Sequence, residues 1–281
     1  MKNYLQPPKK LIVINDMVGV GRCSMTVAIP VISACKVQAC PVPTSVFSNH
    51  TGFPNFFKED LTDALPSYLE GLSKVPVDFQ GIYCGYLGSM KQIQLVGNYI
   101  RKSKEEYNPL VILDPIMGDH GTCYRTITPE FCNEMRSLLP YSDIITPNIT
   151  EACILTETAY HPCRYSEEEL LSICLKLQEL GASKIVITGI KDDHNFYNFI
   201  YEHNNNYILM ETPIAGESRP GTGDIFASII SALVLREYDL VDAVNRASEF
   251  IGACTSATSQ LNIPVQEGVA LELFLSNLIG L

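Results

Sequence analysis

The sequence predicts an α/β fold with a mostly parallel central sheet and helices on both faces of that sheet. Short apolar runs alternate with segments of helical pattern over most of the 281 residues, which is typical of parallel strands buried on both sides. A hydrophobic content of 46% with 18% charged residues supports a large core. No linker, charge block, low-complexity tract or internal repeat divides the chain, so residues 1–281 are expected to form one domain.

Six apolar runs, each bounded by polar or turn-forming residues, are predicted to be strands. They are Leu11–Asn15, Ala39–Phe47, Gly81–Cys84, Leu110–Leu113, Ile144–Thr146 and Lys184–Thr188. Segments with helical spacing of apolar residues lie between them. The predicted helices are Cys23–Cys35, Leu61–Leu72, Gln92–Glu105, Pro129–Leu139 and Ser166–Leu180. Ligands of such sheets bind outside the carboxyl ends of the strands, so the residues after each strand are the first functional candidates.

The pattern changes after Thr188. The runs Phe196–Tyr201 and Asn206–Glu211 flank a turn-rich His203-Asn204-Asn205-Asn206, which predicts a β-hairpin. Three apolar helices are predicted to close the chain. They are Gly223–Arg236, Leu240–Thr258 and Glu267–Ile279.

Charge and cysteine usage exclude several classes of protein. The net charge of −11 argues against a nucleic-acid partner, which would need Lys/Arg patches. The ten cysteines are scattered without a Cys-x-x-Cys pair, so neither a zinc site nor a disulfide framework is indicated. The polar leader before Leu11 and the absence of a long apolar run predict no signal peptide and no membrane span. We therefore expect a cytoplasmic location.

The most informative motif runs from Arg219 to Ser228 and contains Gly221-Thr222-Gly223-Asp224 before an apolar helical segment. Glycines allow close backbone approach, and the free N–H groups of a helix start bind anions. A carboxylate beside phosphate is unfavourable unless it accepts a proton, so the motif indicates a base that activates an attacking hydroxyl. The alternative is an ordinary Gly-rich loop with Asp near a helix N-terminus.

A second Gly-rich segment, Gly19-Val20-Gly21, follows Asn15-Asp16. A dinucleotide-binding fingerprint is disfavoured there, because the third glycine is missing and no acidic residue follows the second strand. Two further polar runs follow strands and are also compatible with simple turns. They are Phe47-Ser48-Asn49-His50-Thr51-Gly52 and Gly85-Tyr86-Leu87-Gly88-Ser89.

Acidic residues follow two more strands. Asp114 and Asp119 flank a Pro- and Gly-containing turn and could supply oxygen ligands to Mg²⁺, directly or through water. Asn148 precedes Glu151 by three residues, which fits either a capped helix start or groups that order metal-bound water and phosphate. Thr188 ends the next strand, where a nucleotide could lie.

Taken in order, these motifs resemble the pyridoxal kinase family of the ribokinase superfamily. The matching set is Phe47-Ser48-Asn49-His50, Gly85-Tyr86-Leu87-Gly88-Ser89, Asp114-Pro115-x-Met117-Gly118-Asp119, Thr146-Pro147-Asn148-x-x-Glu151 and Gly221-Thr222-Gly223-Asp224. The resemblance implies a ribokinase-like three-layer sandwich. It also implies an ATP-dependent kinase that phosphorylates the 5′-hydroxymethyl group of pyridoxal, pyridoxine or pyridoxamine.

The resemblance assigns a role to each matching residue. It makes Asp224 the catalytic base, and Gly221, Thr222 and Gly223 the anion hole around the γ-phosphoryl group. It also assigns residues to the nucleotide, the metal ion and the substrate. Asp114, Asn148 and Thr188 would bind ATP and its phosphates; Asp114, Asp119 and Glu151 would bind Mg²⁺ directly or through water; Asp16, Ser45, His50, Thr51 and Tyr86 would line the substrate site. A homodimer is expected from the resemblance alone, and a monovalent cation would be compatible with it.

One residue departs from the family pattern. Asp16 stands where the family usually has a serine beside the pyridine ring. A carboxylate there favours a protonated ring nitrogen or a substrate amine, so pyridoxamine is expected to be used at least as well as pyridoxal. The departure leaves open a hydroxymethylpyrimidine or small-sugar kinase of the same fold. A catalytically idle vitamer- or phosphate-binding regulator is a third alternative, although a pure binder gains nothing from acids around phosphate.

Overall fold

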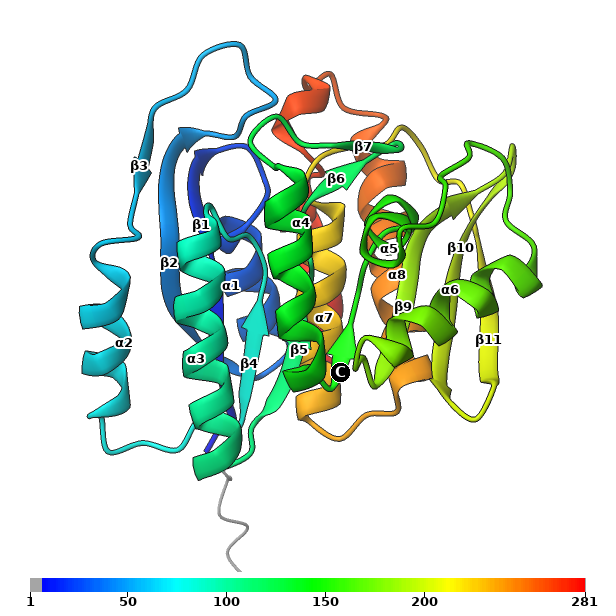
Figure 1. The fold of residues 1–281 in the computed structure, drawn as a ribbon. Helices are drawn as coiled ribbons and strands as arrows, with labels where there is room; N and C mark the ends of the chain where they lie inside the picture. The colour runs from blue at the N-terminus through cyan, green and yellow to red at the C-terminus, as the bar shows by residue number, and fades with distance from the viewer. Residues whose placement is uncertain (1–6, 281) are drawn as a thin grey trace, which may run out of the picture.

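A nine-stranded sheet forms the centre of the computed structural model, which describes residues 7–280 (Figure 1). The strand order is β11-β10-β9-β8-β5-β4-β1-β2-β3. The strands are β1 (Lys10–Val20), β2 (Gln38–Asn49), β3 (Lys58–Asp60), β4 (Gly81–Cys84), β5 (Leu110–Leu113), β8 (Ile144–Ile145), β9 (Lys184–Lys191), β10 (Asn195–His203) and β11 (Asn206–Pro213). A separate two-stranded ribbon consists of β6 (Gly118–Asp119) and β7 (Thr122–Cys123).

Six neighbouring strands from β2 through β9 pair in parallel, and β3, β10 and β11 add antiparallel edges. Parallel pairing requires a crossover between consecutive strands, and the predicted helices provide these crossovers. The predicted mostly parallel sheet and the β10–β11 hairpin are therefore confirmed.

Helices cover both faces of the sheet. One layer contains α2 (Leu65–Ser73), α3 (Met90–Glu106), α4 (Pro129–Met135), the short helix η1 (Arg136–Tyr141), α5 (Ile149–Thr156) and α6 (Glu167–Glu179). The other contains α1 (Met25–Ala34), α7 (Thr222–Leu235), α8 (Leu240–Thr258) and α9 (Leu275–Ile279).

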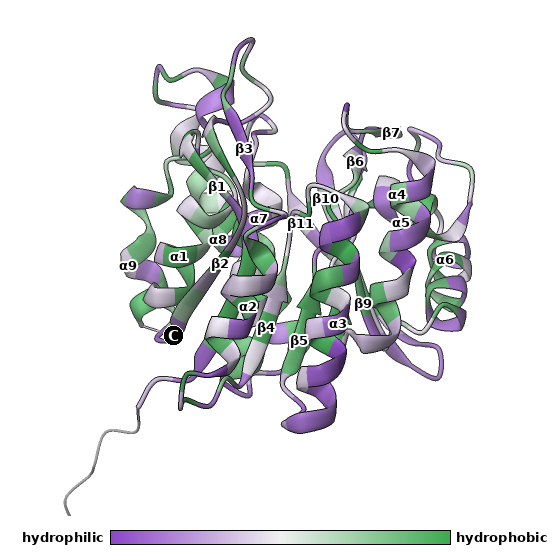
Figure 2. Ribbon diagram, turned by 60° about the vertical axis from the view of Figure 1, so that its left-hand side comes forward, coloured by the Kyte–Doolittle hydropathy of each residue, from purple (hydrophilic) through white to green (hydrophobic). Residues whose placement is uncertain are grey.

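Side chains of strand β1 contribute to the hydrophobic cores on both faces of the sheet. Ile12 and Ile14 belong to the core beneath α2–α6, whereas Leu11 and Val13 belong to the core beneath α1, α7 and α8. Successive side chains of a strand point to opposite faces, so a continuous apolar run fills two cores. Figure 2 shows the resulting apolar ribbon in the interior and polar outer helix surfaces.

One predicted helix is wrong. Glu267–Ile279 is divided into the short helices η2 (Val265–Glu267), η3 (Leu271–Leu273) and α9. Gly268, at φ +77°, ends η2, and the backbone leaves helical geometry again at Ala270 (ψ 64°) and Phe274 (φ −122°), on either side of η3, so the apolar spacing of this segment does not form one helix. The sequence did not predict the edge strand β3 or the β6–β7 ribbon, and it allowed helix α5 only as one of two interpretations of Asn148 and Glu151.

The predicted polar leader falls mainly on residues 1–6, outside the described part of the chain. Within residues 7–280, no helix is both long and apolar enough to cross a membrane.

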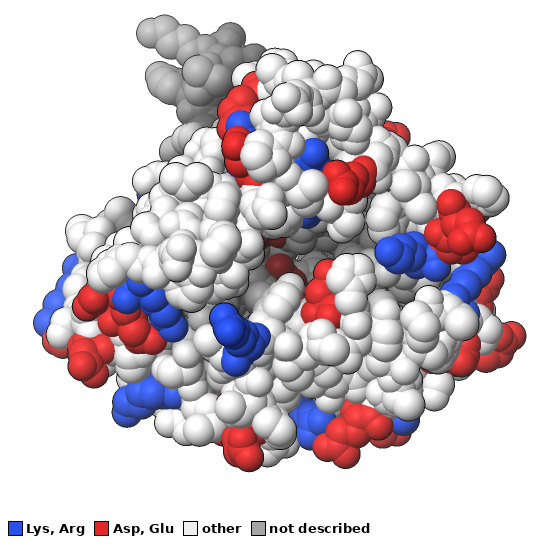
Figure 3. Space-filling model, turned by 90° about the horizontal axis from the view of Figure 1, so that it is seen from above, with Lys and Arg blue, Asp and Glu red and all other residues white. Residues whose placement is uncertain are grey.

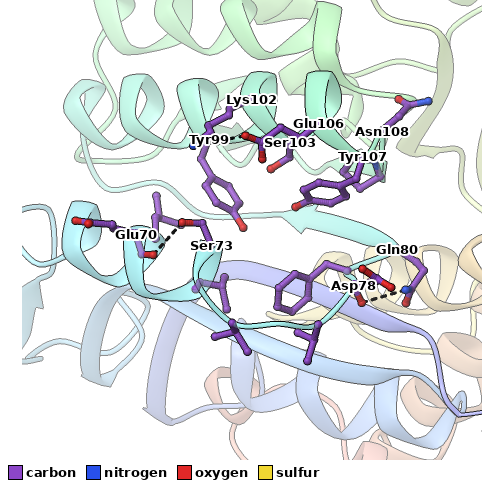
Figure 4. Close-up of a pocket in the computed structure, with 16 residues that line it drawn as sticks. Glu70, Ser73, Asp78, Gln80, Tyr99, Lys102, Ser103, Glu106, Tyr107 and Asn108 are labelled. Atoms are coloured by element: carbon purple, nitrogen blue, oxygen red, sulfur yellow. Dashed lines mark hydrogen bonds and ion pairs between the residues drawn. The ribbon is translucent and has the colours of Figure 1, made fainter.

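A cavity of about 700 Å³ opens between the carboxyl-terminal ends of α2 and α3, where Phe79, Tyr99 and Tyr107 contribute to its wall (Figure 4). It lies beside the segment that enters β4, at the amino end of the parallel strands. None of the predicted site residues lines it.

Candidate active site

A second cavity, of about 360 Å³, lies at the carboxyl ends of the parallel strands. Its size falls within the range of small-ligand sites. Figure 3 looks onto this end of the molecule and shows a hollow with acidic side-chain atoms at its floor. The predicted residues that line the cavity are Asp114, Asp119, Asn148, Glu151, Thr188, Gly221, Thr222, Gly223 and Asp224. The nucleotide, metal and catalytic candidates are therefore brought together by the fold.

The anion-binding candidate is the start of α7. Its N-cap Gly221 has a left-handed backbone, φ +82°. A Cβ atom at this position would lie 1.8 Å from the carbonyl oxygen of Arg22. Only glycine can satisfy both conditions, so the backbone of the cavity rim packs directly on the loop before α1. The first N–H groups of α7 face the cavity without a side-chain cap from Gly221.

Asp224 lies in the first turn of α7 and is buried. Its Oδ1 accepts a hydrogen bond of 3.1 Å from Nδ2 of Asn15 on β1. Burial raises the pKa of Asp224, while the Ser24 backbone N–H and the Asn15 amide oppose that rise. A carboxylate with a raised pKa is a stronger proton acceptor than a free one, so the environment favours a general base.

Asp114 follows β5 directly and is buried. Burial, reinforced by the nearby Asp224 carboxylate, raises its pKa to about 8. Like charges in a low-dielectric site oppose each other's ionisation. A cation bound at the floor of the cavity would therefore stabilise the ionised forms of Asp114 and Asp224.

Asn148 and Glu151 form a capping box at the start of α5. Glu151 Oε2 accepts from the Asn148 N–H at 2.8 Å, and its Oε1 accepts from the Met117 N–H at 3.0 Å. Asn148 Nδ2 donates to Gly118 O of the β6–β7 ribbon at 2.8 Å. The capped helix start that the sequence allowed is present. Both residues line the cavity, and they also fasten the ribbon that carries Asp119 to α5.

Asp119 differs from the other acids because its side chain is 49% exposed. Its Oδ1 accepts from the His120 N–H at 2.7 Å. No group of three acidic, His or Cys side chains converges on a common point within residues 7–280.

The substrate candidates divide into two sets. Asp16, Ser45 and Tyr86 lie near the middle of β1, just beyond its pairing with β4: Asp16 and Ser45 are buried, and the Tyr86 N–H donates to Asn15 Oδ1 at 2.9 Å. The strand continues to Val20, so Asp16 lies within it rather than after it, where the predicted bounds Leu11–Asn15 had placed it. His50 and Thr51 lie in the loop after β2. His50 Nε2 is 2.6 Å from the Gln266 carbonyl oxygen, so this histidine joins two loops at the rim.

Three residues with structural links to the site had no role in the sequence prediction. Asn15 fixes Asp224; Lys58 of β3 lies near the Tyr86 ring; and buried Arg219 donates to the carbonyl oxygens of Pro264 and Gly268. Arg219 thereby holds the 264–268 loop against the anion-binding turn. The polar pair Asn15-Asp16 after an apolar run was the only sequence signal for Asn15, and no sequence signal pointed to Lys58.

Comparisons with known proteins agree with this fold. Residues 28–268 match the family described as phosphomethylpyrimidine kinase. A Bacteroides thetaiotaomicron protein, provisionally named a phosphomethylpyrimidine kinase, has a crystal structure that is 36% identical with a TM-score of 0.92. The match covers 98% of this chain and 96% of that one. Another crystal form of that protein contains pyridoxal.

Two further relatives are pyridoxal kinases. The crystal structure of the enzyme from Lactobacillus plantarum is 27% identical with a TM-score of 0.87, and the match covers 97% of each chain. The pyridoxal kinase PdxY of Corynebacterium diphtheriae is 25% identical over 248 residues, which is 85% of either chain.

Proposed function

The chain belongs to the phosphomethylpyrimidine kinase family, where it is similar to the pyridoxal kinases of ribokinase-like fold, and from this premise we propose its reaction. It transfers the γ-phosphoryl group of ATP to the 5′-hydroxymethyl group of a vitamin B6 vitamer. The kinase unit comprises residues 1–281.

One observation carries the proposal: Asp224 connects the cavity at the strand ends with the Asn15-Asp16 segment of β1. It lines the 360 Å³ cavity that contains the anion-binding turn, and it bonds Asn15 on the β1 side, next to Asp16. A nucleotide in the cavity and a hydroxymethyl heterocycle near Asp16 would meet at this carboxylate. Its raised pKa suits proton removal from the attacking hydroxyl.

The start of α7 and Asp224 would carry out the phosphoryl transfer together. The N–H groups at the start of α7 bind the γ-phosphoryl oxygens, because these groups are unpaired and lie at the positive end of the helix. Asp224 orients the substrate hydroxyl and takes its proton as the new P–O bond forms. Positioning and charge stabilisation do most of the work in a loose phosphoryl-transfer transition state.

Mg²⁺ would be held by Asp114, Asp119 and Glu151, directly or through water, and would neutralise charge on the transferring phosphate. Asp114 is the strongest candidate for direct contact. Both Glu151 oxygens already accept backbone hydrogen bonds, which favours a role through water. Asn148 and Thr188 would lie beside the phosphates and the nucleotide.

Asp16 would contact the heterocycle. Burial, with Asp224 nearby, raises its pKa to about 7, so a cationic ring or amine would stabilise its ionised form. We propose that pyridoxamine is used at least as well as pyridoxal. A hydroxymethylpyrimidine substrate is the main alternative, since the matching family profile is named for phosphomethylpyrimidine kinase. A cytoplasmic location and a homodimer also remain proposals, and the homodimer rests on resemblance alone.

The test is an ADP-release assay with the three vitamers, hydroxymethylpyrimidine and ribose. We expect turnover with at least one vitamer to exceed that with hydroxymethylpyrimidine and ribose. Faster turnover of hydroxymethylpyrimidine than of every vitamer would assign the alternative reaction. Calorimetric binding of a vitamer without ATP consumption would instead indicate an idle binding protein.

A further inference from the structure

The edge strand β3 brings a lysine to the substrate face of the sheet. Lys58 pairs directly with Phe47 of β2, and Phe47 pairs with Val18 of β1. Directly paired residues project to the same face, and residues two apart on one strand share a face. Lys58 therefore lies on the face that carries Val18. Asp16 precedes Val18 by two residues, across a register shift between Asn15 and Met17, and the Lys58 charge is near enough to oppose the rise in the pKa of Asp16.

The Lys58 ammonium is within reach of several groups of this face. Its Nζ is 3.5 Å from Asp60 Oδ2, and 5.7 Å and 6.0 Å from the ring centroids of Phe47 and Tyr86. A Cβ atom at Gly88 would lie 3.4 Å from Nζ and 3.3 Å from Ser45 Oγ. The side chain is only 25% exposed, so the ammonium group lies against the protein surface rather than extending into solvent.

Two buried side-chain oxygen atoms close to Lys58 have no hydrogen-bond partner in the protein. Among residues 7–280, Asp16 Oδ1 and Ser45 Oγ are buried without a hydrogen bond. Unpaired buried polar atoms are costly and call for an explanation such as a missing ligand. The face thus offers an acceptor at Asp16, a hydroxyl at Ser45 and a cation at Lys58, beside the Tyr86 ring.

We propose that Lys58 is a specificity-determining residue that binds the ring oxygen of a 3-hydroxypyridine substrate as its oxyanion. The inference rests on the proposed function and restricts its substrates to 3-hydroxypyridines. A B6 vitamer carries its ring nitrogen, 3-oxygen and 5-hydroxymethyl group at alternate ring positions. Asp16 takes the ring N–H, Lys58 the 3-oxygen and Asp224 the hydroxymethyl proton, so a zwitterionic ring matches the charges of all three.

The same contact discriminates against the main alternative substrate. Hydroxymethylpyrimidine has a bare ring nitrogen at the position of the 3-oxygen, so it presents no oxyanion to Lys58. Discrimination arises because the Lys58 ammonium stabilises the 3-oxyanion of a vitamer, whereas with hydroxymethylpyrimidine it finds no new partner and keeps only its contact with Asp60. Lys58 therefore selects vitamers, whereas Asp224 and the anion-binding turn serve either substrate equally.

The kinetic test compares wild type with Lys58→Met on pyridoxine, 3-deoxypyridoxine and hydroxymethylpyrimidine. Lys74→Met is the matched control, since this exposed lysine of α2 pairs only with Glu70 among the ion pairs of the described residues. We expect Lys58→Met to lower kcat/KM for pyridoxine about 10- to 100-fold, the range of a lost charge-assisted hydrogen bond. The values for the other two substrates should stay within about two-fold. Equal losses on pyridoxine and 3-deoxypyridoxine would overturn the proposal.

A spectroscopic test is independent of turnover. The absorption of a 3-hydroxypyridine differs between its neutral and oxyanion forms, so pyridoxine is titrated with protein in the absence of ATP. Wild type should shift bound pyridoxine toward the oxyanion spectrum; Lys58→Met should not, and Lys58→Arg should retain the shift. Identical bound spectra for wild type and Lys58→Met, or no pyridoxine binding by wild type, would overturn the proposal.

The two tests separate failure of the inference from failure of the proposed function. If wild type phosphorylates no vitamer, the proposed function fails, and the spectra still decide the role of Lys58. Thermal unfolding of each variant checks the fold. If Lys58→Met unfolds early, the decision passes to Lys58→Arg, which must retain both the oxyanion spectrum and the preference for pyridoxine over 3-deoxypyridoxine.

Discussion

Asn15 Nδ2 donates to Asp224 Oδ1 over 3.1 Å, across 209 positions of sequence. The same amide uses its Oδ1 to accept the backbone N–H groups of Asp16 and Tyr86, each at 2.9 Å. One buried side chain therefore fixes the candidate base Asp224, the candidate ring-binding acid Asp16 and Tyr86 relative to each other.

Replacing Asn15 should change the proton affinity of the base. Asn15→Leu removes a hydrogen bond that favours the Asp224 carboxylate, so the pKa of Asp224 should rise. The acid limb of the kcat–pH profile should then move to higher pH.

The Asn15→Leu variant also leaves two backbone N–H groups without their acceptor, which should cost about 1–3 kcal/mol of unfolding free energy each. Thr258→Val, which removes a buried acceptor of the Ala270 N–H, should destabilise the protein without moving the profile; an unmoved profile in Asn15→Leu would contradict the positioning role.

Asp224→Asn should lower kcat about 10²- to 10⁴-fold, the usual contribution of a positioned general base. ATP affinity should hold or improve, because the shape of the side chain is kept and a negative charge near phosphate is lost. Steady-state kinetics and ATP titration measure the two effects separately. Turnover close to that of wild type would remove Asp224 from the mechanism.

The two glycines of the anion-binding turn should behave differently when replaced by alanine. Gly221→Ala places a Cβ atom against the Arg22 carbonyl oxygen in a left-handed backbone, so it should unfold at a lower temperature and lose activity. Gly223→Ala meets no atom within 4 Å and lies in α7, so its stability should be unchanged or slightly higher. Its methyl group would nevertheless crowd the phosphate, and KM for ATP should rise. Equal stability losses in the two variants would argue against the packing role of Gly221.

Activity should vanish with a chelator and return with Mg²⁺, and Asp119→Asn should raise the Mg²⁺ concentration needed by about 10-fold. Asp119 is the clearest test because its half-exposed side chain contributes little to packing. Glu151→Ala should also raise the requirement, but its lost capping box should lower stability by about 1 kcal/mol. Glu179→Gln, an exposed acid at the end of α6, is the control. Unchanged metal titrations would leave both acids as purely structural groups.

The buried acids predict how stability depends on pH without ligand. The pKa values of Asp114 and Asp16 are raised from 3.8 to about 8 and about 7 by burial, so the folded state binds more protons than the unfolded state between these limits. Their contribution to stability is therefore present below about pH 4 and is lost as pH rises toward 8. Mg²⁺ with ATP should reduce this loss by supplying positive charge. Chemical unfolding of wild type and Asp114→Asn from pH 5 to 8 measures it, and equal slopes would contradict the prediction.

The sequence by itself determined the sheet, most of its covering helices and the chemistry gathered at one edge. Apolar runs such as Leu110–Leu113 and capped amphipathic segments such as Ser166–Leu180 are local patterns, and the structure confirms both within one residue at each end. The motif around Asp224 could be read because its glycines and acid are adjacent in sequence. The kinase resemblance followed from the order of such local motifs.

Tertiary structure decided what depends on residues far apart in the chain. Nothing in the apolar spacing of residues 267–279 indicated that the backbone leaves helical geometry at Gly268, Ala270 and Phe274. The strand β3 has only three residues and exists through pairing with β2, so Lys58 could not be placed at the substrate face beforehand. Burial likewise sets the raised pKa values of Asp16, Asp114 and Asp224, because desolvation depends on the packed surroundings rather than on neighbours in sequence.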